Sequence, residues 1–220
     1  MAAFGPNGPF EPGEWPLRFG SVSDTHATRS ALRLELRRRR AGLDDDDQAA
    51  ASMAVMARLA RIPALRRAGL VSGYRAVGGE LDIDAALILL AERGASVTVP
   101  RVNGEHLEFV RWQADDPARP GPFGIPEPVA DAVVPLRLHD VVLAPLVAFD
   151  DLGNRLGQGG GHYDRALADC GAERPVVIGI AHSFQQVPRL AVEAWDVPID
   201  AVVTEEAVLE FRAGCLDPSI

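Results

Sequence analysis

The chain has 220 residues, 47% of them hydrophobic, and a formal net charge of −9. This length and apolar content suit one domain with a sizeable core, and the acidic charge argues against a general nucleic-acid-binding protein, because phosphate backbones select basic surfaces. The two cysteines lack metal-ligand spacing and form no disulfide framework, no stretch is long and apolar enough for a membrane span, and no signal peptide is evident. We therefore expect a cytoplasmic monomer without nucleic-acid or membrane partners.

The N-terminal region divides into a leader and a helix. Residues 1–27 are rich in Pro and Gly without periodicity, which predicts a flexible leader. A helix is expected over about residues 28–41, with Leu32 and Leu36 on its buried side. Four arginines then share one face of this helix, three and four residues apart: Arg29, Arg33, Arg37 and Arg40. Taken alone, that face is more typical of a solvated basic surface than of a binding surface.

An acidic run follows at residues 44–47. It predicts the start of a second helix over about residues 45–60, because carboxylates cap a helix N-terminus and favour its dipole. Capping explains the run without a metal ion.

The remaining elements alternate in type. Strands are expected near residues 69–74, 95–99, 106–112, 140–146, 175–181 and 199–204, and helices near 82–93 and 161–169. This order predicts the α/β class: a single domain over residues 28–212, with three α/β/α layers and a mainly parallel sheet. Residues 213–220 form a C-terminal tail, and the Pro-rich stretch 117–128 is a long excursion between sheet elements.

A glycine-rich loop follows the apolar run 141–147, with four glycines among residues 157–161. Strand, glycine loop and helix start together turn backbone N–H groups toward an anion, so we interpret the loop as a phosphate site and not as a bland surface loop. A Walker loop is excluded because all 22 basic residues are arginine, and the dinucleotide pattern fails because His162 stands where its last glycine belongs.

Ligands of such sheets bind beyond the carboxyl ends of the strands. The turn at residues 75–80, the end of a strand at Pro100 and Arg101, and the glycine loop could all open onto that rim. One pocket could then collect most of the candidate residues.

The motif Phe149-Asp-x-x-Gly-Asn-Arg-Leu-Gly-x-Gly-Gly-Gly-x-Tyr-Asp-Arg165 resembles the 5-formyltetrahydrofolate cyclo-ligase family. The resemblance extends over about residues 29–211 and includes shorter motifs in the same order: Gly79-Glu80-Leu81-Asp82, Val99-Pro100-Arg101, Gly124-Ile125-Pro126-Glu127-Pro128 and Pro198-Ile199-Asp200. It implies an enzyme that closes 5-formyltetrahydrofolate to 5,10-methenyltetrahydrofolate, with ATP as co-substrate and Mg²⁺ as cofactor.

The resemblance also implies roles for individual residues. Arg155 and Asp164 are the expected catalytic pair, and Asp164 and Asp200 the expected metal ligands. The expected ATP-binding residues are Arg29, Arg33, Arg155, Gly157, Gly159, Gly160, Gly161, His162 and Tyr163. The expected folate-binding residues are Arg75, Glu80, Gly159, Gly160, Gly161 and His162. Arg29 stands where the family has lysine, and Gln158 and His162 also depart from the common pattern.

Several of these residues have simpler interpretations. Asp200 could cap the turn that follows it, Glu80 could be an exposed turn residue, and Tyr163 could stack on a ligand ring or only pack. His106, His139 and His182 lack spaced partners and are interpreted as structural.

Two other functions remain as alternatives. One is a non-catalytic folate- or nucleotide-binding relative on the same fold. The other is a sugar-phosphate isomerase on a similar sheet, which would need a group placed for proton abstraction and no ATP.

Overall fold

The computed structural model describes residues 22–121, 124, 126–129 and 132–217. Most of the predicted leader and the end of the predicted tail lie outside this range. Helix α1 (Val22–Ala41) begins six residues before the predicted boundary, and α2 (Asp45–Leu59) follows almost as expected. Asp44 caps α2, since its side chain accepts a 2.8 Å hydrogen bond from the Asp47 amide.

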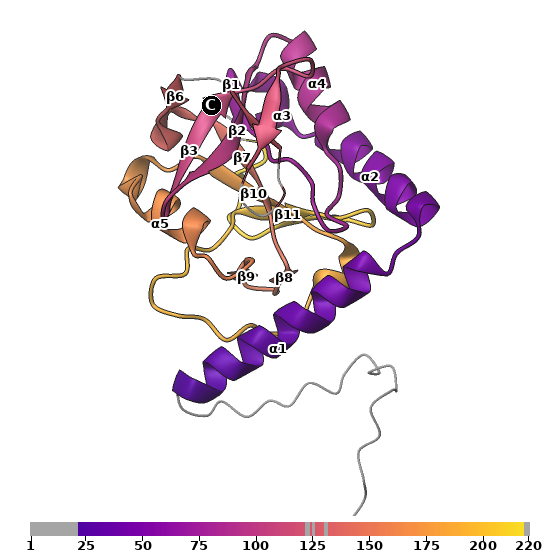
Figure 1. Ribbon diagram of the computed structural model, residues 1–220, viewed down its shortest axis with the longest axis vertical. Coiled ribbons are helices and arrows are strands. Elements are labelled where there is room, and N and C mark those ends of the chain that lie inside the picture. Colours follow the sequence, from indigo (N-terminus) through magenta and orange to yellow (C-terminus); the bar gives the residue numbers. More distant parts are fainter. Residues whose placement is uncertain (1–21, 122–123, 125, 130–131, 218–220) are drawn as a thin grey trace, which may run out of the picture.

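The described residues form a mixed sheet in the order β12-β11-β10-β7-β1-β2-β3-β6 (Figure 1). Its centre is parallel: β11 (Ala201–Val203), β10 (Val176–Ile180), β7 (Val141–Pro145), β1 (Leu70–Ser72) and β2 (Ser96–Asn103). Toward the edges the pairing is antiparallel: β12 (Val208–Glu210) pairs with β11 on one side, and on the other β3 (His106–Arg111) pairs with β2 and β6 (Val133–Val134) pairs with β3. The predicted α/β class with a mainly parallel sheet is therefore confirmed.

Helices cover both faces of the sheet. Strand β7 shows this directly, because Val141 and Leu143 join one core cluster whereas Val142 and Ala144 join another. The first cluster lies under α2, α3 (Pro63–Arg67) and α4 (Asp84–Glu92), and the second lies under α5 (His162–Ala168). A strand buried on both faces has no alternating polar positions, which is why the strand appears in the sequence as a continuous apolar run.

Short elements were not expected. The stretch 117–128 contains the antiparallel pair β4 (Ala118–Pro120) and β5 (Pro126–Pro128). The segment before the glycine loop contains β8 (Ala148–Phe149) paired with β9 (Arg155–Leu156). Strands of two or three residues are too short to show a period in sequence, and α3 is only five residues long.

Helix α1 crosses the end of the molecule beside β8 and β9 (Figure 1). Leu32 and Leu36 are buried, as predicted, and pack against Val147, Ala148 and Leu156. Burial of these leucines holds α1 across the side of the sheet where the parallel strands end.

The C-terminal end of α1 also packs against the turn that follows β1. Arg40 Nε donates a 2.9 Å hydrogen bond to the carbonyl of Gly78. Gly79 has φ +77°, and a Cβ there would lie 2.7 Å from the Arg40 carbonyl oxygen. Both the positive φ and the close approach require glycine at this position.

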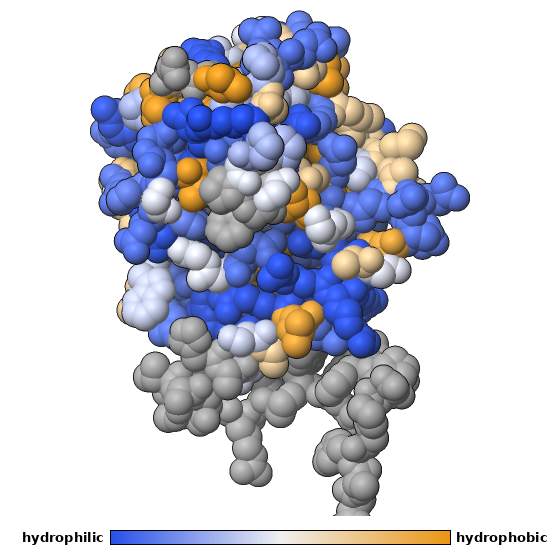
Figure 2. Space-filling model, in the orientation of Figure 1, coloured by the Kyte–Doolittle hydropathy of each residue, from blue (hydrophilic) through white to orange (hydrophobic). Residues whose placement is uncertain are grey.

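One face of the molecule is shown with its hydropathy in Figure 2. The face in Figure 2 is mostly hydrophilic, with hydrophobic residues in small, separate groups. Within the described part of the chain, no helix has the length and apolar character needed to cross a membrane.

Removing the cap of α2 tests the predicted helix start. Asp44→Ala should lower stability by about 1 kcal/mol, or about 2–4 °C in thermal midpoint for a chain of this size. Asp46→Ala is the matched control, because it removes a first-turn charge but leaves the cap. Equal losses in the two variants would show that the cap contributes nothing beyond charge.

Alanine at Gly79 tests the contact between α1 and the β1 turn. Gly104 has φ +60°, and no atom lies within 4 Å of the position that a Cβ would take there, so Gly104→Ala should cost only the left-handed backbone, about 1–2 kcal/mol. Gly79→Ala adds the clash with the Arg40 carbonyl and should cost at least about 1 kcal/mol more. Urea unfolding of both variants measures the difference, and equal costs would contradict a close contact.

Candidate functional site

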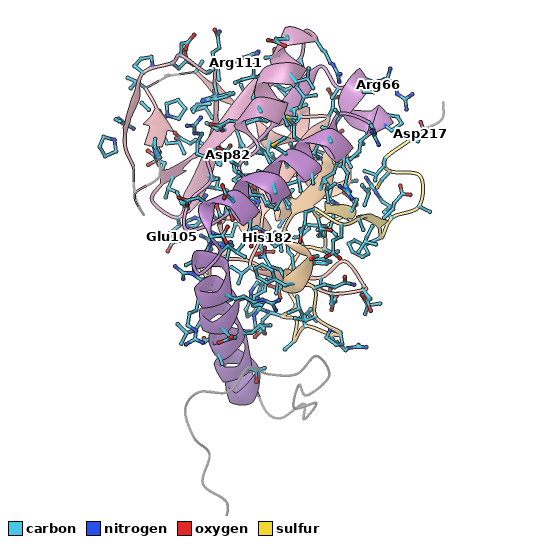
Figure 3. All side chains as sticks on the ribbon, turned by 90° about the vertical axis from the view of Figure 1, so that its right-hand side faces the viewer. Arg66, Asp82, Glu105, Arg111, His182 and Asp217 are labelled. Atoms are coloured by element: carbon cyan, nitrogen blue, oxygen red, sulfur yellow. The ribbon has the colours of Figure 1, made fainter. Side chains whose placement is uncertain are left out.

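The expected site residues gather where the parallel strands end. The turn after β1 carries Glu80, the loop after β7 carries the glycines, and the segment after β10 carries His182. Glu105, in the turn after β2, and His182 both lie in the half of the molecule nearer α1, whereas Arg111 lies at the far end (Figure 3). The expected rim of the sheet is therefore where these residues meet.

The glycine loop is packed against α1 and the β2–β3 turn. Arg33 Nε donates a 2.9 Å hydrogen bond to the carbonyl of Gly157. His162 Nδ1 lies 3.1 Å from the Glu105 carbonyl oxygen, and Arg165 donates to the same oxygen at 2.7 Å. A Cβ at Gly160 would lie 2.6 Å from the His162 ring, so this glycine permits a close approach that alanine would not.

Arg155 and Asp164 form an ion pair in which the arginine is buried and the aspartate partly buried. Arg155 is 5% exposed, and its Nη2 donates to Asp164 Oδ1 at 2.9 Å. The same oxygen accepts a 3.0 Å hydrogen bond from the Val197 amide. Burial lowers the pKa of the Arg155 guanidinium, and the Asp164 carboxylate opposes that effect. The pair thus keeps a cation next to the glycine loop.

Two buried polar atoms beside this pair lack partners among the described residues: Arg155 Nε and the Tyr163 hydroxyl. The Arg155 guanidinium lies 5.9 Å from the centre of the Tyr163 ring. Burial, followed by the nearby Glu80 carboxylate, raises the pKa of Tyr163, which keeps its hydroxyl neutral. An unpaired buried donor costs about 1–3 kcal/mol, so a polar ligand that reached these atoms would recover that cost.

Glu80 is buried, not exposed on a turn. Its Oε1 accepts a 2.9 Å hydrogen bond from Gln158 Nε2 and lies 3.5 Å from Arg40 Nη2, while Oε2 accepts from the Val77 amide at 3.2 Å. Burial raises the pKa of the Glu80 carboxyl, and Arg40, Val77 and Gln158 oppose the rise. The Gln158 contact places this carboxylate directly against the glycine loop.

Arg29 and Arg33 share a face of α1 but have different partners. Arg33 contacts the glycine loop, whereas Arg29 pairs with both carboxylate oxygens of Asp196 and donates to the Ala191 carbonyl. The hydrogen bond to Asp196 raises the pKa of Arg29. Arg29 thus anchors the segment 191–196 and leaves Arg33 as the α1 arginine at the loop.

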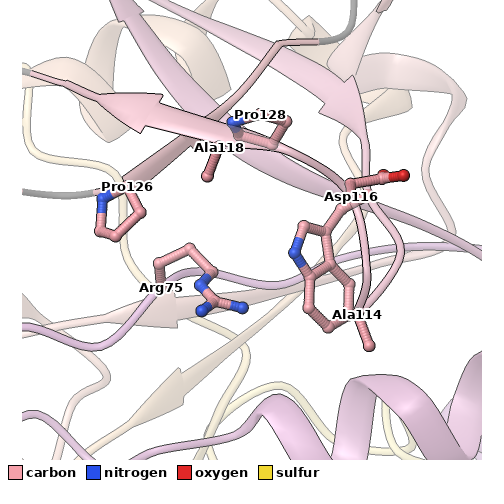
Figure 4. Close-up of a pocket in the computed structure, with 7 residues that line it drawn as sticks. Arg75, Ala114, Asp116, Ala118, Pro126 and Pro128 are labelled. Atoms are coloured by element: carbon pink, nitrogen blue, oxygen red, sulfur yellow. The ribbon is translucent and has the colours of Figure 1, made fainter.

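Arg75 makes an ion pair with α4. Its Nη1 lies 2.8 Å from Asp84 Oδ2, and its guanidinium lies 5.4 Å from the centre of the Trp112 ring. With Trp112 it lines a small cavity of about 40 Å³ beneath β4 and β5 (Figure 4). Its role in folate binding stays a prediction.

Asp200, the other expected metal ligand, is paired with two arginines. Asp200 immediately precedes β11 and is buried. Its carboxylate accepts two hydrogen bonds from Arg174, pairs with Arg212 at 2.9 Å and accepts from the Val177 amide at 2.7 Å. Both oxygens therefore have protein partners here, and the metal role of Asp200 stays a prediction.

Among the residues described, no three His, Cys, Asp or Glu side chains are grouped to hold a metal ion. Asp164 nevertheless fits the Mg²⁺ that accompanies a nucleotide, because Mg²⁺ commonly takes only one or two protein carboxylates and completes its shell with phosphate and water. No hydrogen bond to its Oδ2 is found among the described residues.

The three histidines interpreted as structural are partly accounted for. His139 Nε2 lies 2.8 Å from the Thr98 hydroxyl in a buried position, in agreement with the prediction. His182 Nε2 lies 3.1 Å from the Gly79 carbonyl oxygen, so it supports the turn that carries Glu80. Its contact with that turn was not anticipated.

Four residues of this cluster were missed from the sequence: Arg40, Gln158, His182 and Asp196. Arg40 was visible only as the last member of a basic face, and Gln158 only as a departure from the family pattern. No local pattern marks His182 or Asp196, because each contacts a segment more than 100 residues away.

Comparison with known proteins shows which family the chain resembles. The 5-formyltetrahydrofolate cyclo-ligase family model matches residues 25–205. The 5-formyltetrahydrofolate cyclo-ligase of Haemophilus influenzae is 35% identical over 176 residues, covering 78% of this chain and 94% of the relative. The enzyme of the same name from Escherichia coli K12 is 34% identical over 181 residues, covering 80% of this chain and 100% of the relative.

Solved structures give the same result. The 5,10-methenyltetrahydrofolate synthetase of Aquifex aeolicus aligns with a TM-score of 0.74 and 33% identity, over 84% of this chain and 94% of that one. The Mycoplasma pneumoniae synthetase, at 24% identity and a TM-score of 0.67 over 80% and 98% of the two chains, supports the fold. This chain belongs to the 5-formyltetrahydrofolate cyclo-ligase family.

Proposed function

We propose that this enzyme converts 5-formyltetrahydrofolate and ATP to 5,10-methenyltetrahydrofolate, ADP and phosphate. The observation that carries the proposal is the 2.9 Å contact between Gln158 and Glu80. This contact joins the buried Glu80 carboxylate to the glycine loop. The carboxylate is suited to the N–H edge of a pterin, and the loop with its neighbouring arginines is suited to phosphates. One site can therefore hold both substrates in contact.

The formyl oxygen of 5-formyltetrahydrofolate is a poor leaving group and must be activated before the ring can close. The formyl oxygen attacks the γ-phosphorus of ATP and ADP leaves, which gives an iminium phosphate. N10 then attacks the activated carbon, loses its proton, and the former formyl oxygen departs within phosphate. No protein nucleophile is needed, so catalysis consists of positioning and of stabilising charge on the transferring group.

The residues divide between those tasks. Arg155 and Arg33 supply positive charge on either side of the glycine loop. Loop amides can donate to phosphate oxygens because the glycines leave the backbone uncovered. Glu80 accepts hydrogen bonds from the pterin N–H edge. Asp164 would hold Mg²⁺, which supplies charge neutralisation at the phosphates.

The direct test is the absorbance of methenyltetrahydrofolate after 5-formyltetrahydrofolate is mixed with MgATP and the enzyme. Product should appear only when both substrates are present, with ADP formed in equal amount. Binding of both ligands without product would instead indicate the non-catalytic alternative.

The two halves of the site should separate in kinetics. Glu80→Gln removes a charge-assisted hydrogen-bond acceptor worth about 1.5–3 kcal/mol, so folate KM should rise by roughly one to two orders of magnitude while ATP KM changes little. Arg155→Ala should raise ATP KM and lower kcat, because phosphoryl charge redistributes in the transition state.

Glu92→Gln serves as the charge-matched control, because Glu92 is exposed on α4, away from the loop. Thermal unfolding of each variant separates lost binding from lost folding. The reverse pattern, with Glu80→Gln affecting ATP alone, would show that the two halves are assigned the wrong way round.

The metal assignment predicts a change in Mg²⁺ dependence. Asp164→Asn keeps the size of the side chain but removes its charge, so half-maximal activity should require on the order of tenfold more Mg²⁺, with a lower kcat. Asp169→Asn, at the exposed C-terminal end of the same helix, should leave the titration unchanged. An Asp164→Asn titration that matches wild type would remove Asp164 from the metal site.

A further inference from the structure

Arg40 differs from its neighbours on α1. Arg37, Arg38 and Arg39 are exposed, whereas Arg40 is 3% exposed. Its guanidinium donates to the Gly78 carbonyl at 2.9 Å, approaches the Leu146 carbonyl at 3.4 Å and lies 3.5 Å from Glu80 Oε1. A buried cation with such partners has a different role from a solvated basic face.

Burial raises the pKa of the Glu80 carboxyl, and Arg40 is the main positive charge that counteracts this rise. The charged or titratable groups near this carboxylate are Arg40 and Arg37 from α1, Tyr74 after β1, Tyr163 from α5 and, across Gly79, His182. The two tyrosines are buried, which raises their pKa and keeps them neutral. Burial lowers the pKa of His182, so this ring is a weak source of positive charge.

We propose that Arg40 is a positioning residue that keeps Glu80 ionised and turned toward the glycine loop for folate binding. The inference rests on the role proposed for Glu80. Two contacts of Arg40 hold the backbone on either side of the site, at Gly78 and Leu146, and the third holds the carboxylate. Gln158 completes the arrangement from the loop itself.

The direction of the pH effect follows from the charges. Without Arg40, burial dominates, and the Glu80 carboxyl keeps its proton to a higher pH. The pterin edge donates two hydrogen bonds, so it needs two acceptor oxygens on Glu80. A protonated Glu80 carboxyl presents a donor in place of one of them, so folate binding weakens at low pH. As pH rises through the raised pKa, the carboxylate forms and binding recovers.

The test compares Arg40→Met with Arg37→Met by measuring folate KM and ATP KM from mildly acidic to alkaline pH. Arg37 is one turn away and exposed, so solvent screens its charge and its loss should change little. Arg40→Met should raise folate KM about tenfold at neutral pH, equivalent to about 1.4 kcal/mol. Folate KM should approach the wild-type value at alkaline pH, while ATP KM stays within about twofold.

A double variant distinguishes this role from a general structural one. If Arg40 acts through the carboxylate, adding Arg40→Met to Glu80→Gln should raise folate KM little further. The inference would be overturned if the two substitutions raised folate KM additively. It would also be overturned if Arg40→Met raised ATP KM as much as folate KM, or left the pH profile of folate KM unshifted.

Arg40→Lys covers the case in which Arg40→Met does not fold. It keeps the charge but loses the planar fork, so it should lower thermal stability and leave the pH profile close to wild type. A profile shifted toward alkaline pH in Arg40→Lys would count against the inference.

Wild-type turnover tests the proposed function separately. If wild type bound folate without forming product, the same comparison would be made with the folate dissociation constant in place of KM. The proposed function and the role of Arg40 can therefore fail independently.

Discussion

Burial of the Arg40 guanidinium joins three segments that are distant in sequence: the end of α1, the turn after β1 and the end of β7. A buried charge is tolerated only when carbonyls or an opposite charge surround it, so these segments must meet in one arrangement. With Arg40 at one end and Leu32 and Leu36 packed on β8 and β9, α1 has a fixed position. That position places Arg33 against Gly157, and the site depends on it.

Two ion pairs then flank the site. Arg155 pairs with Asp164 on α5, the helix that follows the glycine loop, and Arg40 pairs with Glu80, which contacts Gln158 of the loop. Each pair is close to neutral, so the site does not accumulate charge of one sign at high desolvation cost. The Tyr163 hydroxyl is near both pairs, since the Glu80 carboxylate raises its pKa and the Arg155 guanidinium lowers it.

The sequence predicted what local patterns determine. Apolar runs located the buried parallel strands, Asp44 located the start of α2, and the glycines located the loop. It could not predict contacts that depend on tertiary packing: Gln158 with Glu80, or Asp196 with Arg29. Nor could it predict the ion pairs of Asp200 with Arg174 and Arg212, or of Arg75 with Asp84.

Arg29 illustrates how a departure from the family pattern can have a structural consequence. Two of its nitrogens meet both oxygens of Asp196, and Nη1 also donates to the Ala191 carbonyl. A lysine at this position would bring a single charged nitrogen and could not form the same planar, two-point pair. The guanidinium therefore ties α1 to the segment 191–196, which contains the exposed Trp195. Arg29 is paired in this way, whereas Arg33 and Arg165 donate to the carbonyls of Gly157 and Gly160 in the glycine loop, next to Arg155.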